Sequence, residues 1–282
     1  KTSHDMVSFM RRMTKIKKVG HTGTLDPMAE GVLPVCIGHA TKVADMLTLS
    51  DKCYETEFVL GMTTDTLDSE GEILSECRVD CTKEEIIAAV MSFVGEIEQV
   101  PPMYSALKKD GVRLYELARQ GVEVEREERE CEIFELNVEK ISENEFSIYT
   151  ECSSGTYIRS LIYDIGEALG TGATMTSLNR SFACGINESE CITLAELENY
   201  RDNNELEKVI IPVDKILSEY PKINVTKPQG VRFKNGGELL KQRIKGEVPL
   251  GFVRVYCDNE FLGLGESLEN SENLNVKRVY VE

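Results

Sequence analysis

The sequence lacks a long hydrophobic run and a leader-like segment. No apolar stretch approaches the roughly 18 residues that a membrane-spanning helix needs, so we expect no association with a membrane. No basic segment followed by an apolar one opens the chain, so nothing indicates secretion, and we expect a cytoplasmic protein. The chain begins at Lys1 and not at Met, from which we expect that an N-terminal element is missing.

Patterns that bind metal are also scarce. The chain has three histidines, and its nine cysteines include no CxxC pair; only Cys77 and Cys81 lie close together. A zinc site would therefore have few ligands to draw on, and we expect none. We interpret the cysteines as reduced, buried thiols of a cytosolic protein.

Basic residues are too few to balance the acidic ones. Lys and Arg number 32 against 49 Asp and Glu, which gives a net charge of −17. Taken globally, this charge argues against a polyanionic partner, because binding to phosphates depends on Lys and Arg. The charge is uneven, however: residues 1–42 hold seven basic and three acidic residues, and residues 227–245 hold six and one. These two basic islands either form one binding face or are ordinary solvated surface, and charge alone favours the second interpretation.

Length and composition predict a globular protein. With 282 residues, 41% hydrophobic and 29% charged, the chain is long enough for one large domain or for a large and a small one. The hydrophobic periodicity, the capping boxes at Thr82 and Thr193 and the glycine stops predict an α+β fold with a boundary near residue 215. We expect helices over 3–16, from Thr82 to a stop at Gly95, over 112–120, over 157–169 and after Thr193, and strands over 54–60, 132–138, 145–152, 251–256, 260–264 and 277–281.

The segment from Gly20 to Leu33 carries the most chemical information. It reads GHTGTLDPMAEGVL, and its glycines allow the backbone to approach another group closely. Asp26 precedes Pro27, which favours an extended conformation and holds the carboxylate on a shaped loop. From the residues alone, Asp26 is a turn former, a nucleophile or a metal ligand, and composition favours the turn former.

The same segment strongly resembles the catalytic motif of the TruB family of tRNA pseudouridine synthases, and four further segments agree in the order of that family. They are VLPVCIGHATK at 32–42, KCY at 52–54 with Gly61 and Asp65, QVPPMYSALK at 99–108 with the following LYE and ARQG, and SGTYIR at 154–159 with DIG at 164–166. The resemblance runs from Thr2 to about Arg180 and continues weakly to the C-terminus.

This resemblance implies a fold, a reaction and a set of site residues. The fold is a mixed, mainly antiparallel sheet flanked by helices over residues 1–215, with a small β module over 216–282 that weakly resembles a PUA-like RNA-binding domain; a plain structural appendage is the alternative. The reaction isomerises the T-loop uridine at tRNA position 55 and needs no metal or organic cofactor.

The resemblance also assigns roles to individual residues. Asp26 is the nucleophile, attacking either the base or the ribose. Arg159 pairs with Asp26, and Tyr54 stacks on the flipped base while its hydroxyl helps to take the ring proton. His21 stacks and donates where the base left the tRNA loop, and Leu178 lies near the flipped base, with core packing as its alternative.

We expect five basic side chains to contact phosphates, with a solvated surface role as the alternative for each. They are Lys42, Lys108, Arg113, Arg119 and Arg180. The expected partner is the T-stem-loop of tRNA, bound by a monomer without guide RNA or protein partner. A non-catalytic tRNA-binding or tRNA-folding protein is the main rival, and a guide-RNA-dependent relative is the second.

Overall fold

The computed structural model describes residues 1–280, and the expected α+β class is confirmed. The chain divides into two compact units. The first unit comprises Lys1–Asp5, Thr22–Pro34 and Leu47–Cys191, and the second comprises Met6–His21, Val35–Met46 and Ile192–Glu282. No helix within residues 1–280 is long and apolar enough to cross a membrane. The expected domain boundary at 215/216 stays a prediction.

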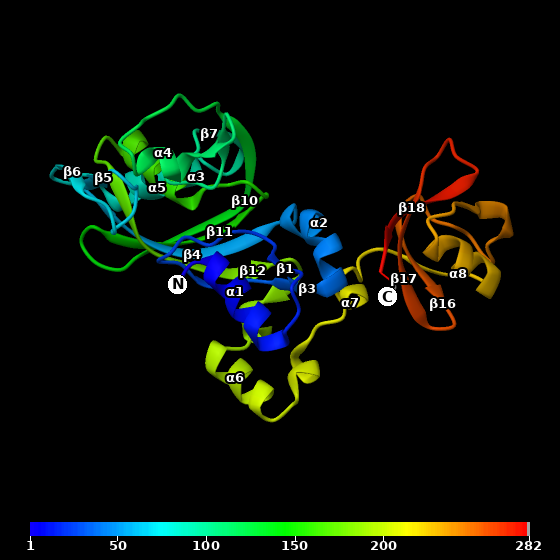
Figure 1. Ribbon diagram of the computed structural model, residues 1–282. Coiled ribbons are helices and arrows are strands. Elements are labelled where there is room, and N and C mark those ends of the chain that lie inside the picture. The colour runs from blue at the N-terminus through cyan, green and yellow to red at the C-terminus, as the bar shows by residue number, and fades with distance from the viewer. Residues whose placement is uncertain (281–282) are drawn as a thin grey trace. The chain divides into compact units, whose positions relative to one another are not determined.

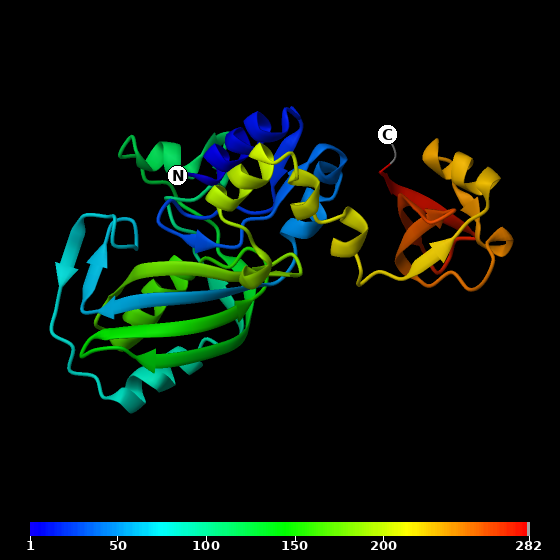
Figure 2. The same cartoon turned by 90° about the horizontal axis from the view of Figure 1, so that it is seen from below.

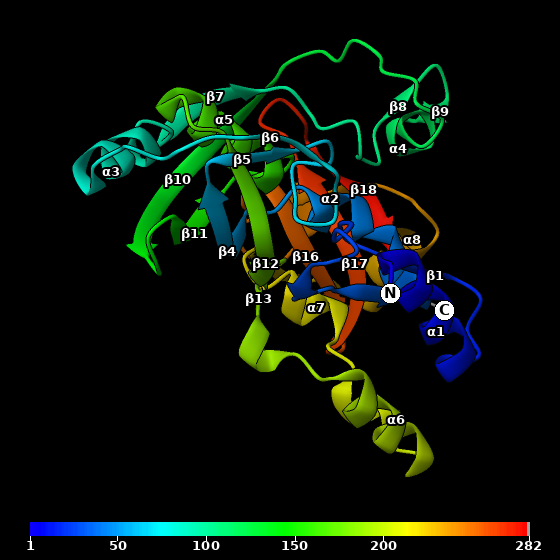
Figure 3. The same cartoon turned by 90° about the vertical axis from the view of Figure 1, so that its left-hand side faces the viewer.

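A large, mostly antiparallel sheet forms the centre of the first unit. Its strands follow the order β13-β12-β4-β11-β10-β7, and Figure 3 shows β12, β4, β11 and β10 side by side. Their alternation follows from the sequence: in β4, Lys52, Tyr54, Thr56, Phe58 and Leu60 are all buried, as a strand with one covered face requires. The bounds are β4 Lys52–Leu60, β7 Gly95–Gln99, β10 Arg129–Lys140, β11 Glu145–Cys152, β12 Ala173–Ala183 and β13 Ile186–Asn187.

Two helices accompany this sheet, α3 (Lys83–Met91) and α5 (Ile158–Leu169). The apolar stripe of α5 is buried, and the helix ends as expected at Gly170, whose φ of 69° places it in the left-handed region that glycine tolerates. The capping box of Thr82 and Glu85 opens α3 as expected. The expected stop at Gly95 is wrong, because α3 ends at Met91 and Gly95 begins β7.

Strand β12 is the main element that the sequence pattern did not reveal. It pairs with β4 along most of its length, and its register shifts between Met175 and Ser177 and again between Arg180 and Phe182. These bulges interrupt the alternation that predicts a strand. Strand β2 (Glu30–Gly31) adds to β12 in parallel and so brings the 22–34 segment to the edge of the large sheet.

Smaller elements complete the first unit. The hairpin of β5 (Met62–Thr64) and β6 (Ile73–Glu76), drawn in cyan, extends away from the long strands in Figure 2. The helix expected over 112–120 is shorter: β8 (Lys108–Lys109) pairs with β9 (Val112–Arg113), and α4 covers only Leu114–Ala118. The 3-10 helix η2 spans Glu188–Glu190.

The second unit contains most of the N-terminal helix and the C-terminal sheet, each labelled in Figure 1. Helix α1 spans Ser3–Thr14, and its Val7 and Met13 are buried. Strand β1 (Val19–His21) pairs with β3 (Val35–Ile37). Further elements are η1 Gly38–Lys42, the first part of α2 (Ala44–Thr48), α6 Leu194–Asp202, η3 Leu206–Val209 and α7 Val213–Ile216.

The C-terminal sheet has the order β14-β16-β17-β18-β15 and packs with α8 around its own apolar core. Val253 and Val255 of β16 and Phe233 of α8 are fully buried in this core. The three expected strands are confirmed, although Val281 lies outside the described residues. The bounds are β14 Lys222–Asn224, α8 Lys227–Lys234, β15 Leu239–Leu240, η4 Lys241–Arg243, β16 Gly251–Cys257, β17 Glu260–Ser267 and β18 Asn273–Val279.

Candidate active site

Asp26 lies on the loop between Thr22 and Pro34, which closes on itself. The Thr22 amide donates to the Pro34 carbonyl at 3.2 Å, and the Ala29 amide donates to the Asp26 carbonyl at 3.0 Å. The Asp26 side chain is 27% exposed, so it is sheltered and still open to a bound molecule. The expectation of a carboxylate held on a shaped loop is therefore confirmed.

Arg159, in the first turn of α5, contacts this carboxylate through two of its nitrogens. Its Nε lies 2.9 Å from Oδ2 of Asp26, and its Nη2 donates to Oδ1 at 2.9 Å. The guanidinium side chain is only 5% exposed. A planar fork that meets both carboxylate oxygens fixes the orientation of the carboxylate as well as its charge.

Arg159 is itself held by three groups on two loops. Its Nη1 donates to the Thr66 carbonyl at 3.1 Å, and its Nη2 donates to the Tyr104 carbonyl at 2.8 Å. Asp68 Oδ2 lies 3.7 Å from Nη1 and is 7% exposed. The guanidinium therefore has little freedom to rotate, and the orientation of Asp26 is set by residues from three other segments: α5, the turn at Thr66 and Asp68, and the loop at Tyr104.

Asp68 is the site residue that the sequence did not single out. Its Oδ1 accepts a hydrogen bond from Thr66 Oγ1 at 2.6 Å and from the Glu70 amide at 3.1 Å. The Ser69 amide donates to the Met175 carbonyl at 2.9 Å, which ties this turn to β12. The available signal was an acidic, Thr-rich turn just after Gly61, but such turns are common on protein surfaces.

The protonation of Asp26 reflects two opposed influences. Burial raises the pKa of the carboxyl above its ordinary value, and the charge and hydrogen bond of Arg159 oppose that rise. Asp68 adds a smaller contribution that raises the pKa further. Arg159 thus limits the cost of keeping a partly buried carboxylate charged.

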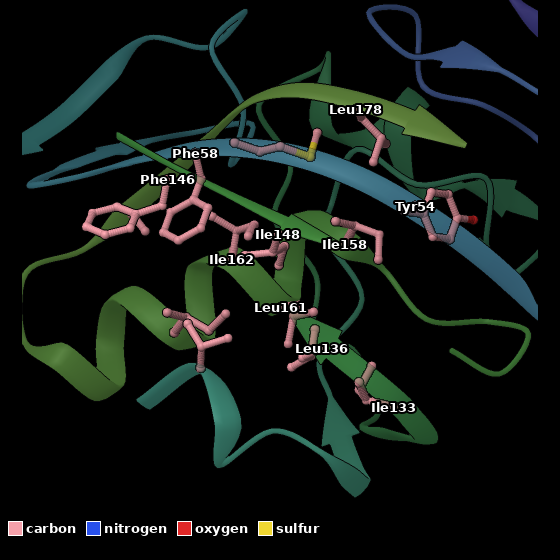
Figure 4. Close-up of a cluster of buried hydrophobic side chains, with 14 of the residues drawn as sticks. Tyr54, Phe58, Ile133, Leu136, Phe146, Ile148, Ile158, Leu161, Ile162 and Leu178 are labelled. Carbon is pink, nitrogen blue, oxygen red and sulfur yellow. The ribbon is translucent and has the colours of Figure 1, made fainter. Parts of the chain in front are cut away.

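Tyr54 lies on β4 and is 8% exposed. Figure 4 shows its ring at one end of the buried cluster, with its hydroxyl pointing away from the other labelled side chains. Burial raises the pKa of the Tyr54 hydroxyl to about 12, and the Arg180 charge lowers it in part. Tyr54 is therefore a neutral phenol near pH 7, and its predicted role in taking the ring proton stays a prediction.

Leu178 and Arg180 both lie on β12, and Arg180 is not in the surface environment that was expected for it. Leu178 is 7% exposed and packs in the same apolar cluster as Tyr54, so it contributes to the core beside the site. Arg180, expected to contact phosphates at the surface, is 2% exposed. That expectation is wrong, because the guanidinium donates to the Val32 carbonyl at 2.8 Å and to the Gly23 carbonyl at 3.3 Å.

The other expected phosphate contacts are more accessible. Lys108, Arg113 and Arg119 are exposed, and the two guanidinium groups lie 5.8 and 5.5 Å from the centre of the Tyr115 ring. Lys42 is half-buried, and its Nζ donates to the Val279 carbonyl at 2.6 Å. Lys108, Arg113 and Arg119 thus form an exposed basic cluster around the β8–β9 hairpin and α4.

His21 ends β1 opposite Val35, within the second unit. It precedes Asp26 by five positions in the sequence. Within residues 1–280, no three His, Cys, Asp or Glu side chains are arranged to hold a metal ion. The chemistry available from the described side chains is that of an oriented carboxylate, a fixed guanidinium and an aromatic ring.

Family models cover almost the whole chain. Residues 11–158 match the N-terminal domain of the TruB family of pseudouridylate synthases, and residues 159–218 match the C-terminal domain of tRNA pseudouridylate synthase B. Residues 221–279 match a C-terminal model described as pseudouridine synthase II TruB. The three matches follow one another without overlap.

Curated proteins give the same result. The tRNA pseudouridine synthase B of Clostridium perfringens strain 13 is 49% identical over 278 residues, which cover 97% of this chain and 93% of that protein. The protein of the same name from Clostridium tetani is 43% identical and covers 94% of this chain and 91% of its own length.

Solved structures share the fold. A Cbf5–Nop10–Gar1 complex contains a chain that superposes with a TM-score of 0.77 at 27% identity, covering all of this chain and 82% of that one. An H/ACA ribonucleoprotein bound to a substrate RNA gives a TM-score of 0.75 at 25% identity.

Proposed function

The chain belongs to the TruB family of pseudouridylate synthases, and from that premise we propose that Asp26 is its nucleophile and that its target is the uridine at position 55 of the tRNA T-loop. It isomerises uridine to pseudouridine in tRNA, the activity for which its 43–49% identical relatives are named. The non-catalytic alternative is not favoured, because the carboxylate, the guanidinium and the tyrosine are all in place.

The reaction exchanges one bond for another and leaves the atom count unchanged. A carboxylate oxygen of Asp26 attacks either the ring or the ribose carbon, and the bond between the ribose and the ring nitrogen breaks. The base turns and its ring carbon bonds to the ribose, the proton on that carbon leaves, the freed ring nitrogen takes up a proton, and Asp26 is released.

The double contact between Arg159 and Asp26 is the single observation that carries this proposal. A nucleophilic carboxylate must be charged and correctly oriented, and one buried guanidinium at 2.9 Å from both oxygens supplies both conditions. Asp68 acts as a positioning residue, since its carboxylate lies 3.7 Å from Arg159 Nη1 and is itself buried.

The aromatic and apolar groups beside Asp26 suit a flipped base. A T-loop uridine is stacked in folded tRNA and must leave the stack to reach the carboxylate. We assign the neutral Tyr54 ring to stacking and Leu178 to the apolar wall beside it, which fits their shared cluster. His21 is proposed to fill the place that the base leaves in the tRNA.

Binding of the tRNA backbone is assigned to exposed cations. Lys108, Arg113 and Arg119 lie on one short segment of the first unit and are open to solvent. Lys42 and the 227–245 island belong to the second unit, and we propose that residues 216–282 form a PUA-like module that grips tRNA away from the T-loop.

We propose that the enzyme works alone, as a monomer in the cytoplasm, without a guide RNA. The complexes of the solved neighbours contain Nop10, Gar1 or an H/ACA ribonucleoprotein. The relatives that match 91–93% of their own length, by contrast, are named as enzymes of tRNA.

The direct test uses the purified protein and an unmodified tRNA transcript with no other macromolecule. The expected result is one pseudouridine at position 55, mapped by chemical sequencing. Modification at another position would contradict the T-loop assignment, and modification only after a guide RNA or protein is added would contradict the stand-alone assignment.

A further inference from the structure

Arg180 places a positive charge in the interior of the first unit beside the catalytic loop. It is the largest of the side chains that are almost fully buried, and it makes no ion pair with a carboxylate of residues 1–280. A buried charge without a counter-ion is costly. Its hydrogen bonds must therefore offset the free energy that burial of this charge costs.

The two hydrogen bonds that its side chain donates to carbonyl groups both go to the segment that carries Asp26. Arg180 Nε donates to the Val32 carbonyl at 2.8 Å, and Nη2 donates to the Gly23 carbonyl at 3.3 Å. Gly23 precedes Asp26 by three positions and Val32 follows it by six. One rigid guanidinium thus binds both ends of the loop.

The main chain of Arg180 adds a third attachment. The Val32 amide donates to the Arg180 carbonyl at 2.8 Å, and Gly31 pairs with Arg180 in the parallel contact of β2 with β12. A Cβ atom on Gly31 would lie 2.3 Å from the Arg180 carbonyl oxygen, so glycine is required there. The loop is thus bound to β12 by backbone and side chain together.

Arg180 also lies beside Tyr54, the residue to which we assign stacking on the base. It is the direct cross-strand partner of Tyr54 on β4, and its charge opposes the rise in the pKa of the Tyr54 hydroxyl that burial causes. Arg159 holds the carboxylate of Asp26 from α5, whereas Arg180 holds the backbone on both sides of Asp26 from β12. The two arginines thus act on different parts of the same nucleophile.

We propose that Arg180 is a positioning residue of the isomerisation, which fixes the Gly23–Val32 loop at both ends so that Asp26 is held within reach of the flipped base. This inference rests on the proposed function. It also predicts that Arg180 does not contribute to tRNA affinity, because its side chain is buried and its Nε and Nη2 already donate to carbonyl groups.

Three variants test the proposal. R180K keeps the charge but loses the fork, and R180M removes the charge at similar length. F58L reduces a fully buried side chain of β4 whose ring stacks on Phe146, and it serves as a stability control. For each we would measure kcat and KM on tRNA, the melting temperature, and amide hydrogen exchange of residues 22–32.

The proposal expects kcat to fall about tenfold to a hundredfold in R180K and further in R180M, since small displacements of a reacting group cost factors of this size. KM should stay within about twofold, and exchange of the 22–32 amides should rise. F58L should melt at a lower temperature yet keep its kcat and the slow exchange of these amides.

A raised KM with an unchanged kcat would overturn the proposal in favour of a phosphate contact. Wild-type kcat in both Arg180 variants, or an equal loss of kcat in F58L at matched stability, would also overturn it. If R180M does not fold, R180K decides the question. Failure of the proposed function is distinguishable, because then the wild-type protein itself would form no pseudouridine in tRNA.

Discussion

Arg159 Nε and Nη2 each lie 2.9 Å from a different oxygen of Asp26, so a single guanidinium spans the whole carboxylate. The same guanidinium donates to the Thr66 and Tyr104 carbonyls. Few donors of Arg159 therefore remain for any other partner. The contact explains how an aspartate that burial would tend to protonate stays available as a charged, oriented nucleophile.

Replacing Arg159 by lysine should nearly abolish turnover, although the positive charge remains. Lysine cannot meet both oxygens or reach the two carbonyl groups at once. We expect kcat to fall by roughly a hundredfold or more, as happens when preorganised donors are removed from a catalytic site. Single-turnover formation of pseudouridine in tRNA measures this effect, and a loss of only a few-fold would reduce Arg159 to a scaffold role.

Replacing Asp68 by asparagine should lower kcat and leave KM nearly unchanged. The carboxylate faces Arg159 at 3.7 Å from a buried position. An amide of the same shape removes the charge and puts an NH2 donor in place of one carboxylate oxygen. We expect a loss of about tenfold, because the guanidinium is then less firmly placed. Asp110→Asn, at an exposed position, is the matched control. Equal kcat in the two variants would show that Asp68 does not position Arg159.

Asp164 should make the stability of the first unit depend on pH. Burial, with a smaller effect of Glu167, raises the pKa of this α5 carboxyl to about 6. A raised pKa in the folded state means that stability is fully present at acid pH and is lost as the pH rises through about 6. Asp164→Asn should therefore melt at a higher temperature than the wild type at pH 7.5.

The advantage of Asp164→Asn should shrink as the pH falls below 6, since the wild-type carboxyl is then protonated. Melting curves at pH 5, 6 and 7.5 measure it, with Asp110→Asn again as the control. An advantage that is constant across this range would contradict the assigned titration.

Binding of tRNA should depend strongly on salt despite the net charge of −17. Each phosphate contact contributes roughly −0.7 to −0.9 to the slope of log K against log salt, so about three to six contacts give a slope between about −2 and −5. Removing Lys108, Arg113 or Arg119 should each reduce the slope by one such increment. The buried Arg180 should not change it, and a flat response to salt in the wild type would exclude the exposed cations as the binding face.

The sequence predicted the regular elements where one periodicity extends over a whole element. β11 alternates cleanly and α5 carries an unbroken apolar stripe, and both were predicted within a residue of their bounds. β12 was missed because its two bulges interrupt the alternation, and α3 was overextended because a glycine near a helix end was read as its stop.

The site was predictable in part. Asp26 and Arg159 were recognised from motifs, and the structure brings them into contact. Asp68 was missed because its partner lies 91 positions away, and a carboxylate in an acidic turn has no local signature. Arg180 was wrongly predicted at the surface because arginine is seldom buried. The carbonyl groups of Gly23 and Val32 that accept its hydrogen bonds lie far away in the sequence.

The most direct test of Asp26 as nucleophile is the rate at which the Asp26→Asn variant converts position 55 of an unmodified tRNA transcript. Because the carboxylate reacts and does not anchor phosphate, we predict no turnover together with a Kd for tRNA within about twofold of the wild-type value at the same salt concentration. Mass spectrometry of the protein after the assay would exclude deamidation back to aspartate. Substantial turnover by a variant shown to be intact would contradict the role of Asp26 as nucleophile.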